Sequence, residues 1–114
     1  MQNATVFVTT TAGSEQEASL LEAVILENRL AACVQRLTIA SAYWWKGKIE
    51  REPEILLLMK TRADLADELT DKIRSEHSYE TPEIVVFPVT GGLPGYLAWI
   101  SNSCREPKKE RPDE

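Results

Sequence analysis

The most constraining feature of the sequence is a long stretch, residues 31–46, that contains neither glycine nor proline and ends in a turn at residues 46–47. As one extended strand, residues 32–46 would span about 50 Å at ~3.4 Å per residue. The radius of gyration expected for a chain of this length is only ~13 Å. The strand must therefore bend sharply near residues 36–37, or it must reach beyond its own domain.

Local patterns predict the other elements. Ser14 and Glu17 form a capping box, in which a hydroxyl and a carboxylate satisfy free backbone amides at a helix start. Thr61 and Asp64 repeat this pattern before a second apolar stripe of helical spacing. The predicted elements are, in order, a strand over 5–10, a helix over about 15–30, a strand over 31–46, a strand over 55–61, a helix after residue 61, a strand over 84–87 and a short helix over 96–100. This order, βαββαβ with a short C-terminal helix, predicts an α+β domain with the split βαβ arrangement that is called ferredoxin-like.

The chain is expected to form one domain over residues 1–104. Residues 105–114 carry four bases, four acids and two prolines but no apolar side chain, which predicts a disordered tail. No apolar run approaches the ~20 residues that cross a bilayer, and the first residues lack the pattern of a signal peptide. Cys33 and Cys104 are too few for a disulfide framework. We therefore expect a cytoplasmic chain that has reduced thiols and no membrane partner.

Two strands are apolar on both faces. Residues 55–59 and 84–87 carry apolar side chains at consecutive positions, so both faces of these strands need cover, while the two long helices of this topology cover only one. The aromatic run Tyr43, Trp44 and Trp45 at the hairpin tip is also typical of an interface. These features predict an oligomer in which another subunit's sheet covers the free face. The alternative is that the long strand kinks and the tryptophans fold back onto their own core.

His77 is the only histidine, and it stands close to Glu80 and Glu83. An imidazole with carboxylates nearby can bind a divalent transition metal or act as a general base. The alternative is that His77 caps the C-terminus of the second helix, where a donor or a cation is favoured. The spacing favours the cap, because one histidine without a nearby cysteine does not complete a zinc or copper site within one chain.

Other polar residues allow both a structural and a functional interpretation. Cys33 lies in an apolar context typical of a buried thiol, whereas Cys104 beside the tail can be exposed and oxidisable. Lys60 ends an apolar strand, so its ammonium group should meet either an ion-pair partner or a bound anion. The alternating glutamates in residues 50–54 share one strand face, which is typical of a solvated edge.

Charge and motifs argue against several classes of function. The formal net charge is -5, whereas nucleic-acid binding draws its affinity from clustered Lys and Arg. RNA binding on the sheet would also need exposed aromatic strand positions and basic rims. No phosphate loop, nucleophile elbow, HExxH or CxxC motif is present. The residues alone therefore predict an acidic, oligomeric α+β domain without a nucleic-acid partner, and they indicate no particular reaction.

A set of short motifs resembles the CutA family of divalent-cation tolerance proteins. The resemblance covers residues 6–100 and is specific because the motifs occur together, in order and at the right separations. The matching residues are Thr9-Thr10, Leu30-Ala31-Ala32-Cys33-Val34, Tyr43-Trp44-Trp45-Lys46-Gly47-Lys48-Ile49-Glu50, Lys60-Thr61, the run from His77 to Glu83, and Tyr96-Leu97 followed by Trp99-Ile100.

The resemblance implies a tight homotrimer of ferredoxin-like subunits, with Tyr43, Trp44, Trp45 and Trp99 at the interface. It also implies an association with copper and other divalent metals, a cytoplasmic setting in bacteria, and no established enzymatic reaction or tightly bound cofactor. Members of the family have further been linked to signalling by analogy with the trimeric PII proteins.

The site that the resemblance implies combines an intersubunit pocket of Cys33, Lys60 and Tyr79 with metal ligands at His77, Glu80 and Glu83. Two departures weaken it: Ser78 stands where the family run usually has proline, and Thr10 stands where some members place a cysteine. Without that thiolate, which Cu(I) prefers, we expect weak binding of Cu²⁺ or another divalent cation. The expected function is therefore non-enzymatic metal tolerance. The alternatives are a PII-like sensor that binds a small anion near Lys60, and an enzyme that uses His77 as a base.

Overall fold

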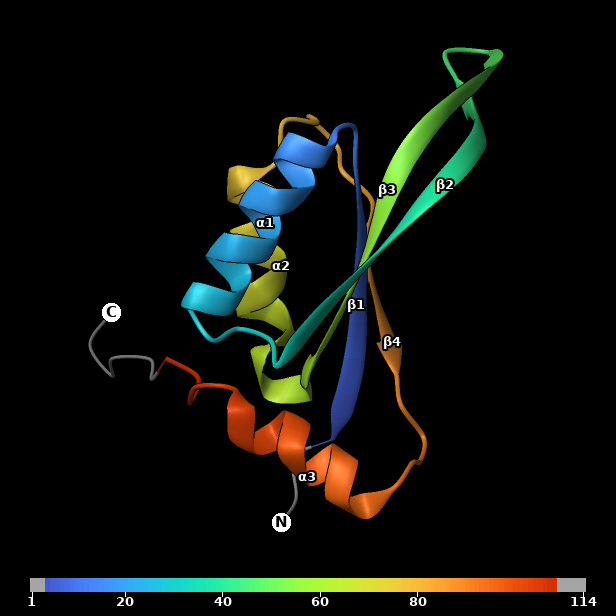
Figure 1. Cartoon of the computed structure of the whole chain (residues 1–114). Helices are drawn as coiled ribbons and strands as arrows, with labels where there is room; N and C mark the ends of the chain where they lie inside the picture. The colour runs from blue at the N-terminus through green and yellow to red at the C-terminus, as the bar shows by residue number, and fades with distance from the viewer. Residues whose placement is uncertain (1–3, 109–114) are drawn as a thin grey trace, which may run out of the picture.

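The computed structural model describes residues 4–108. The strands are β1 (Thr5–Ala12), β2 (Cys33–Trp45), β3 (Lys48–Arg62) and β4 (Ile84–Pro88), and the helices are α1 (Glu15–Glu27), α2 (Ala66–Glu76) and α3 (Pro94–Ser103), with a short 3-10 turn, η1 (Ala63–Leu65), before α2. The four strands form one antiparallel sheet in the order β2-β3-β1-β4 (Figure 1). The predicted α+β class is therefore confirmed.

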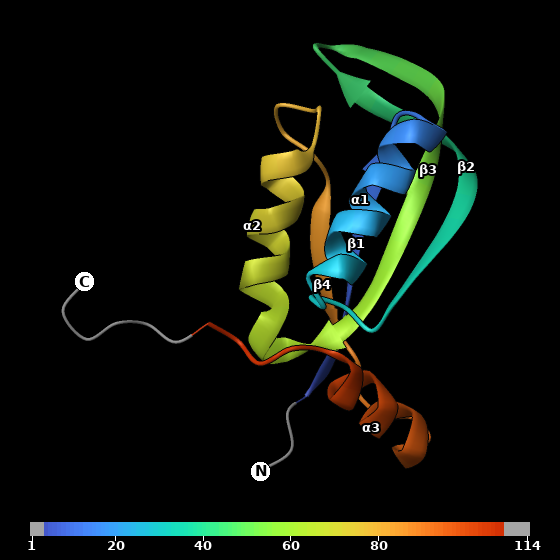
Figure 2. The same ribbon diagram turned by 60° about the vertical axis from the view of Figure 1, so that its left-hand side comes forward.

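The core lies between the sheet and the two helices α1 and α2, which cover the same face of the sheet (Figure 2). Alternate residues of β1 and β3 point toward these helices, as the period of two along a strand requires. The fully buried large side chains of this core include Val8, Leu57 and Met59 from the strands and Leu21, Ile25, Leu69 and Ile73 from the helices. No helix of the described residues is long and apolar enough to cross a membrane.

The first helix begins where its cap was expected and ends earlier than expected. Ser14 Oγ accepts the backbone N–H of Glu17 at 3.1 Å, so the N-terminal cap is confirmed. The helix ends at Glu27 instead of near residue 30, because Arg29 takes a left-handed backbone conformation with φ of 54°.

The predicted cap of the second helix is wrong. Thr61 belongs to β3, is fully buried and donates its hydroxyl hydrogen to Leu30 O at 2.7 Å. The helical turn begins after Arg62 without a side-chain cap. Thr61 and Asp64 therefore match the spacing of a capping box, but burial in the sheet holds Thr61 in the strand.

β2 and β3 form a hairpin that projects beyond the rest of the sheet (Figure 1). β1 pairs with β3 only as far as Ile55, whereas β2 stays paired up to Trp45 opposite Lys48. The turn has positive φ at both positions, 49° at Lys46 and 77° at Gly47, which suits the twist of a hairpin. The radius of gyration is 15.3 Å, above the ~13 Å of a compact chain of this length, because the hairpin reaches outward.

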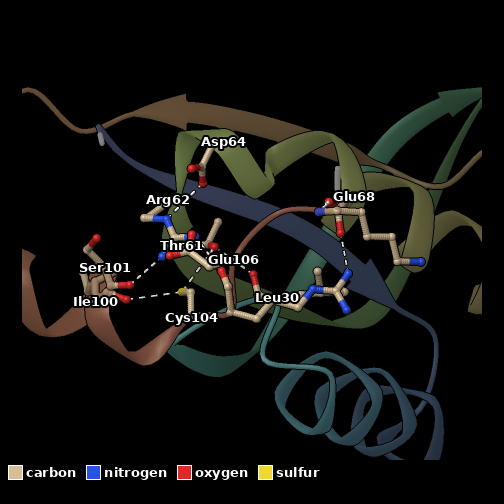
Figure 3. Close-up of polar contacts among 11 residues, drawn as sticks. Leu30, Thr61, Arg62, Asp64, Glu68, Ile100, Ser101, Cys104 and Glu106 are labelled. Atoms are coloured by element: carbon tan, nitrogen blue, oxygen red, sulfur yellow. Dashed lines mark hydrogen bonds and ion pairs between the residues drawn. The ribbon is translucent and has the colours of Figure 1, made fainter. Parts of the chain in front are cut away.

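A polar clasp around Arg62 holds the end of the described chain against the body (Figure 3). The guanidinium group, only 5% exposed, donates to Ser101 O at 2.7 Å, to Arg105 O, and to the Asp64 carboxylate at 3.0 Å. Arg105 in turn pairs with Glu68 of α2. The clasp therefore joins the end of β3, the end of α3 and the start of α2.

The clasp places ordered residues within the segment that was predicted to be a tail. That tail should begin at residue 105, but the backbone N–H of Lys108 still donates to a carboxylate of α2 at 2.7 Å. The prediction for residues 109–114 lies outside the described residues. The expectation that Cys104 is exposed is wrong, because its thiol is buried and donates to Ile100 O at 3.2 Å. Within residues 105–108, ion pairs and hydrogen bonds from charged side chains hold the backbone against the body, although these residues carry no apolar side chain.

Candidate functional site

The face of the sheet opposite α1 and α2, here called the free face, carries a largely apolar set of side chains. The strand register arranges them in rows across the sheet. One row consists of Cys33, Lys60, Phe7 and Phe87, the next of Gln35, Leu58, Thr9 and Val85, and the third includes Leu37 and Leu56. Leu37 is 65% exposed, and Val85 and Phe87 are exposed as well. An apolar surface of this kind is typical of an interaction site.

Lys60 is the charged member of the first row, and aromatic groups hold it in place. Its Nζ atom donates to Tyr96 Oη at 3.1 Å, and it lies 5.2 Å from the ring centre of Tyr96 and 5.5 Å from that of Phe7. Tyr96 stacks on Trp99, so α3 supplies an aromatic wall. Lys60 makes no ion pair with any of residues 4–108. The sequence predicted either an ion-pair partner or a bound anion for Lys60. Residues 4–108 of one protomer do not supply the ion-pair partner.

The tip of the β2–β3 hairpin exposes its aromatic side chains. Trp44 is 73% exposed and Trp45 is 56% exposed, so the alternative in which they fold back onto their own core is wrong. Tyr43 donates its hydroxyl hydrogen to Glu52, and this hydrogen bond, with the charge of neighbouring carboxylates, raises the pKa of Tyr43 to about 12. The tip is thus an apolar projection beside an acidic strand.

Tyr79 contacts β3 at Glu54, far along the strand from Lys60. Burial and the hydrogen bond from its hydroxyl to Glu54, at 3.1 Å, raise the pKa of Tyr79 to about 12. Glu54 is itself buried, so the prediction of a solvated edge over residues 50–54 is wrong for this glutamate. About 20 Å of strand separates Glu54 from Lys60. One protomer therefore places Cys33 beside Lys60 but leaves out Tyr79, the third residue of the predicted pocket.

His77 forms the C-terminal cap of α2, the structural alternative that its spacing favoured. Its side chain is fully buried. Nε2 lies 2.6 Å from Thr11 O, and Nδ1 accepts the backbone N–H of Tyr79 at 3.1 Å. A carbonyl oxygen only accepts hydrogen bonds, so Nε2 carries the ring proton and donates it to Thr11. In this geometry neither ring nitrogen has a lone pair free for a metal or for proton abstraction.

Glu80 and Glu83, the other predicted metal ligands, are exposed. Among residues 4–108, no group of three or more His, Cys, Asp and Glu side chains is placed to hold a metal ion. One protomer therefore does not preassemble a metal site at the end of α2. A metal site that uses Glu80 and Glu83 would need ligands beyond those that residues 4–108 of one protomer bring together. Metal binding by these two carboxylates therefore stays a prediction.

Glu17, which the sequence indicated only as a helix cap, also holds the segment that contains His77. Its carboxylate accepts the backbone N–H of Ser78 at 2.7 Å and that of Gly13 at 3.4 Å, and it lies 3.5 Å from His77 Nδ1. Burial acts to raise the pKa of Glu17, but the hydrogen bonds from Ser78 and Gly13 outweigh it, so the pKa lies below the ordinary value of 4.5. No local spacing signals the contact between positions 17 and 78.

Glu17→Gln should destabilise the fold by about 1–2 kcal/mol at neutral pH, since an amide oxygen is a weaker acceptor than a carboxylate. Because folding lowers the pKa of Glu17, the carboxylate stabilises the fold above pH 4.5, and this stabilisation is lost as the pH falls through the lowered pKa. Urea denaturation at a series of pH values should show that the difference in free energy of unfolding between wild type and variant becomes smaller in acid. The control is Glu15→Gln, which changes an exposed glutamate two residues earlier. If the loss of stability caused by Glu17→Gln is the same at every pH, the prediction is contradicted.

Residues 6–103 match the family model described as CutA1 divalent ion tolerance protein. The chain belongs to this family. The divalent-cation tolerance protein CutA of Archaeoglobus fulgidus is 40% identical over 97 residues, which cover 85% of this chain and 95% of that protein. The protein of the same name from Salmonella newport is 43% identical over 101 residues, 88% of each chain. The crystal structure of CutA1 from Oryza sativa has a TM-score of 0.88 to this fold at 38% identity, and the match covers 91% of this chain and 96% of that chain.

The CutA relatives differ in length and in the compartment that their names give. The chain spans about half the length of two plant relatives, 58% of the chloroplastic CutA 1 of Oryza sativa and 45% of the chloroplastic CutA of Arabidopsis thaliana. The solved structure from Archaeoglobus fulgidus is described as a periplasmic protein. The cytoplasmic location expected for this chain therefore stays a prediction. The family names describe tolerance proteins and not enzymes.

Proposed function

We propose that this CutA chain forms a homotrimer of ferredoxin-like subunits that serves in divalent-metal tolerance, copper included, without catalysing a reaction. The observation that carries the proposal is the free face, which keeps exposed apolar side chains while the other face of the sheet packs on α1 and α2. Family membership supports the role in metal tolerance. A PII-like sensing function has no comparable support from the family match.

A neighbouring sheet is the cover that best fits the free face. Leaving Leu37 and Phe87 in water forfeits about 25 cal/mol for each Å² of apolar surface. A sheet packs well on another sheet because the inward side chains of both interdigitate. In the proposed trimer the β2–β3 hairpin reaches a neighbouring subunit, and the interface includes Tyr43, Trp44, Trp45 and Trp99.

The mass in solution tests the proposed assembly. We expect light scattering to give three times the chain mass of 12.8 kDa. Leu37→Asp on the free face should dissociate the trimer, because it would bury an unpaired carboxylate, whereas Leu20→Asp on the outer side of α1 should leave the mass unchanged. Both leucines are exposed in the protomer, so neither change should unfold it. A wild-type mass of one chain, or equal behaviour of the two variants, contradicts the proposal.

We further propose that the trimer binds Cu²⁺ or another divalent cation weakly, without a tightly bound cofactor. Glu80 and Glu83 supply exposed carboxylate oxygens, and Thr10 in place of a cysteine leaves no thiolate for Cu(I) at that position. Calorimetric titration of copper sulfate should give weak binding to wild type and less binding to a Glu80→Gln, Glu83→Gln double variant. Identical isotherms for the two proteins would place the bound cation elsewhere.

A further inference from the structure

The row that contains Lys60 holds a charge that the described part of one protomer does not balance. Lys60 is half-buried, and its register neighbours are the thiol of Cys33 on β2 and the ring of Phe7 on β1. Tyr96 offers the ammonium group a hydroxyl oxygen and a ring face. These partners are dipolar and carry no counter-charge.

Covering the free face makes this unbalanced ammonium group costly. A charge that is removed from water without a counter-charge is strongly unfavourable. The proposed trimer, on which this inference rests, removes water from the free face and therefore from the surroundings of Lys60. When a neighbouring subunit covers the free face, we expect an anion to lie beside Lys60 and balance its charge.

We infer that Lys60 and Tyr96 form a binding site for a carboxylate group. Because Tyr96 Oη accepts a hydrogen bond from Lys60 Nζ at 3.1 Å, its own hydroxyl hydrogen remains available for donation. The ammonium group and the hydroxyl thus present two neighbouring donors, which match the two oxygens of one carboxylate. A singly charged carboxylate also balances one lysine, whereas a phosphate dianion leaves a negative charge over.

Aromatic rings flank the two donors and define the rest of the site. The ring of Phe7 lies 5.5 Å from Lys60 Nζ, and Trp99 stacks on Tyr96 with ring centres 5.6 Å apart. These rings suit a ligand with a flat apolar body attached to the carboxylate. The carboxylate has two sources, a free small molecule or a glutamate of a neighbouring subunit, and both present the same group to Lys60.

Benzoate is a suitable probe, and benzamide, its neutral analogue of similar shape, is the control. Both are titrated at constant ionic strength into wild type, Lys60→Met, Lys60→Arg and Tyr96→Phe, with the melting temperature as readout. We expect saturating benzoate to raise the Tm of wild type by about 4 °C or more, and benzamide to leave it unchanged. Lys60→Met should abolish the shift, Lys60→Arg should retain it, and Tyr96→Phe, which keeps the ring, should weaken benzoate binding about tenfold.

The trimer dissociation constant, measured on the same variants, separates the two sources. If a neighbouring subunit supplies the carboxylate, benzoate leaves wild type unchanged, and Lys60→Met dissociates at least tenfold more readily while Lys60→Arg does not. Equal benzoate shifts in wild type and Lys60→Met, or no change in either measurement, would overturn the inference. If wild type is a monomer, the proposed trimer is refuted, whereas the benzoate titration still tests the carboxylate site at Lys60. Failure of the trimer and failure of the site can therefore be told apart.

Discussion

Arg62→Met should lower the free energy of unfolding by about 3–4 kcal/mol. The guanidinium group is 5% exposed and holds Ser101 O, Arg105 O and the Asp64 carboxylate at once. Methionine fills much of the same space but donates no hydrogen bond, so these acceptors lose their partner inside the clasp. Urea denaturation followed by tryptophan fluorescence and circular dichroism measures the loss.

The controls for this prediction separate the clasp from a general effect of charge. Arg74→Met removes an exposed arginine of α2 whose one ion pair with residues 4–108 is to Asp71 at 3.8 Å, and it should change stability little. Arg62→Lys keeps the charge but lacks the planar fork that reaches several acceptors, so it should fall between wild type and Arg62→Met. An Arg62→Met variant as stable as Arg74→Met would show that the clasp contributes nothing measurable.

His77→Ala should lower the free energy of unfolding by about 2–4 kcal/mol while leaving the copper isotherm of the folded protein unchanged. The ring is fully buried and joins the end of β1, through Thr11 O, to the segment after α2, through the N–H of Tyr79. Alanine leaves a cavity and two unsatisfied backbone groups. Denaturation measures the first effect, and calorimetric titration with copper sulfate measures the second.

Two variants sharpen the test of His77. His77→Asn retains an N–H donor and should recover part of the stability, because a hydrogen bond to Thr11 O can form again. The Glu80→Gln, Glu83→Gln double variant should do the opposite of His77→Ala, with unchanged stability and a weaker copper isotherm. Loss of copper binding in folded His77→Ala would contradict the structural role and would assign the ring as a metal ligand.

Several parts of the fold could be predicted because their signals are local. The hairpin turn at Lys46 and Gly47 and the cap at Ser14 follow from residue preferences within a few positions. Consecutive apolar residues in β3 indicated two faces that need cover, and the exposed Leu37 in the neighbouring strand lies on the face that the helices leave free.

Other predictions failed where a local pattern competed with burial. Thr61 matches a cap by spacing, but it pairs with Val6 of β1 and is fully buried in the sheet, where Leu30 O accepts its hydrogen bond. Glu54 alternates with exposed glutamates, yet it is buried and accepts a hydrogen bond from the Tyr79 hydroxyl. Cys104 adjoins a charged tail, yet it is buried as part of the hydrophobic core, and its thiol donates to Ile100 O.

The candidate site shows the same division. The sequence by itself determined the order of strands and helices and the position of the hairpin turn, because residue preferences and periodicity act between near neighbours in the chain. It placed the start of the third strand at residue 55, whereas β3 begins at Lys48, and it left open whether the hairpin bends back or extends. Only the tertiary structure decided that Lys60 meets Tyr96, that His77 meets Thr11 and that Arg62 meets Ser101. These pairs stand 36, 66 and 39 positions apart. Spacing along the chain carries no information about such distances, since they depend on how sheet and helices pack together.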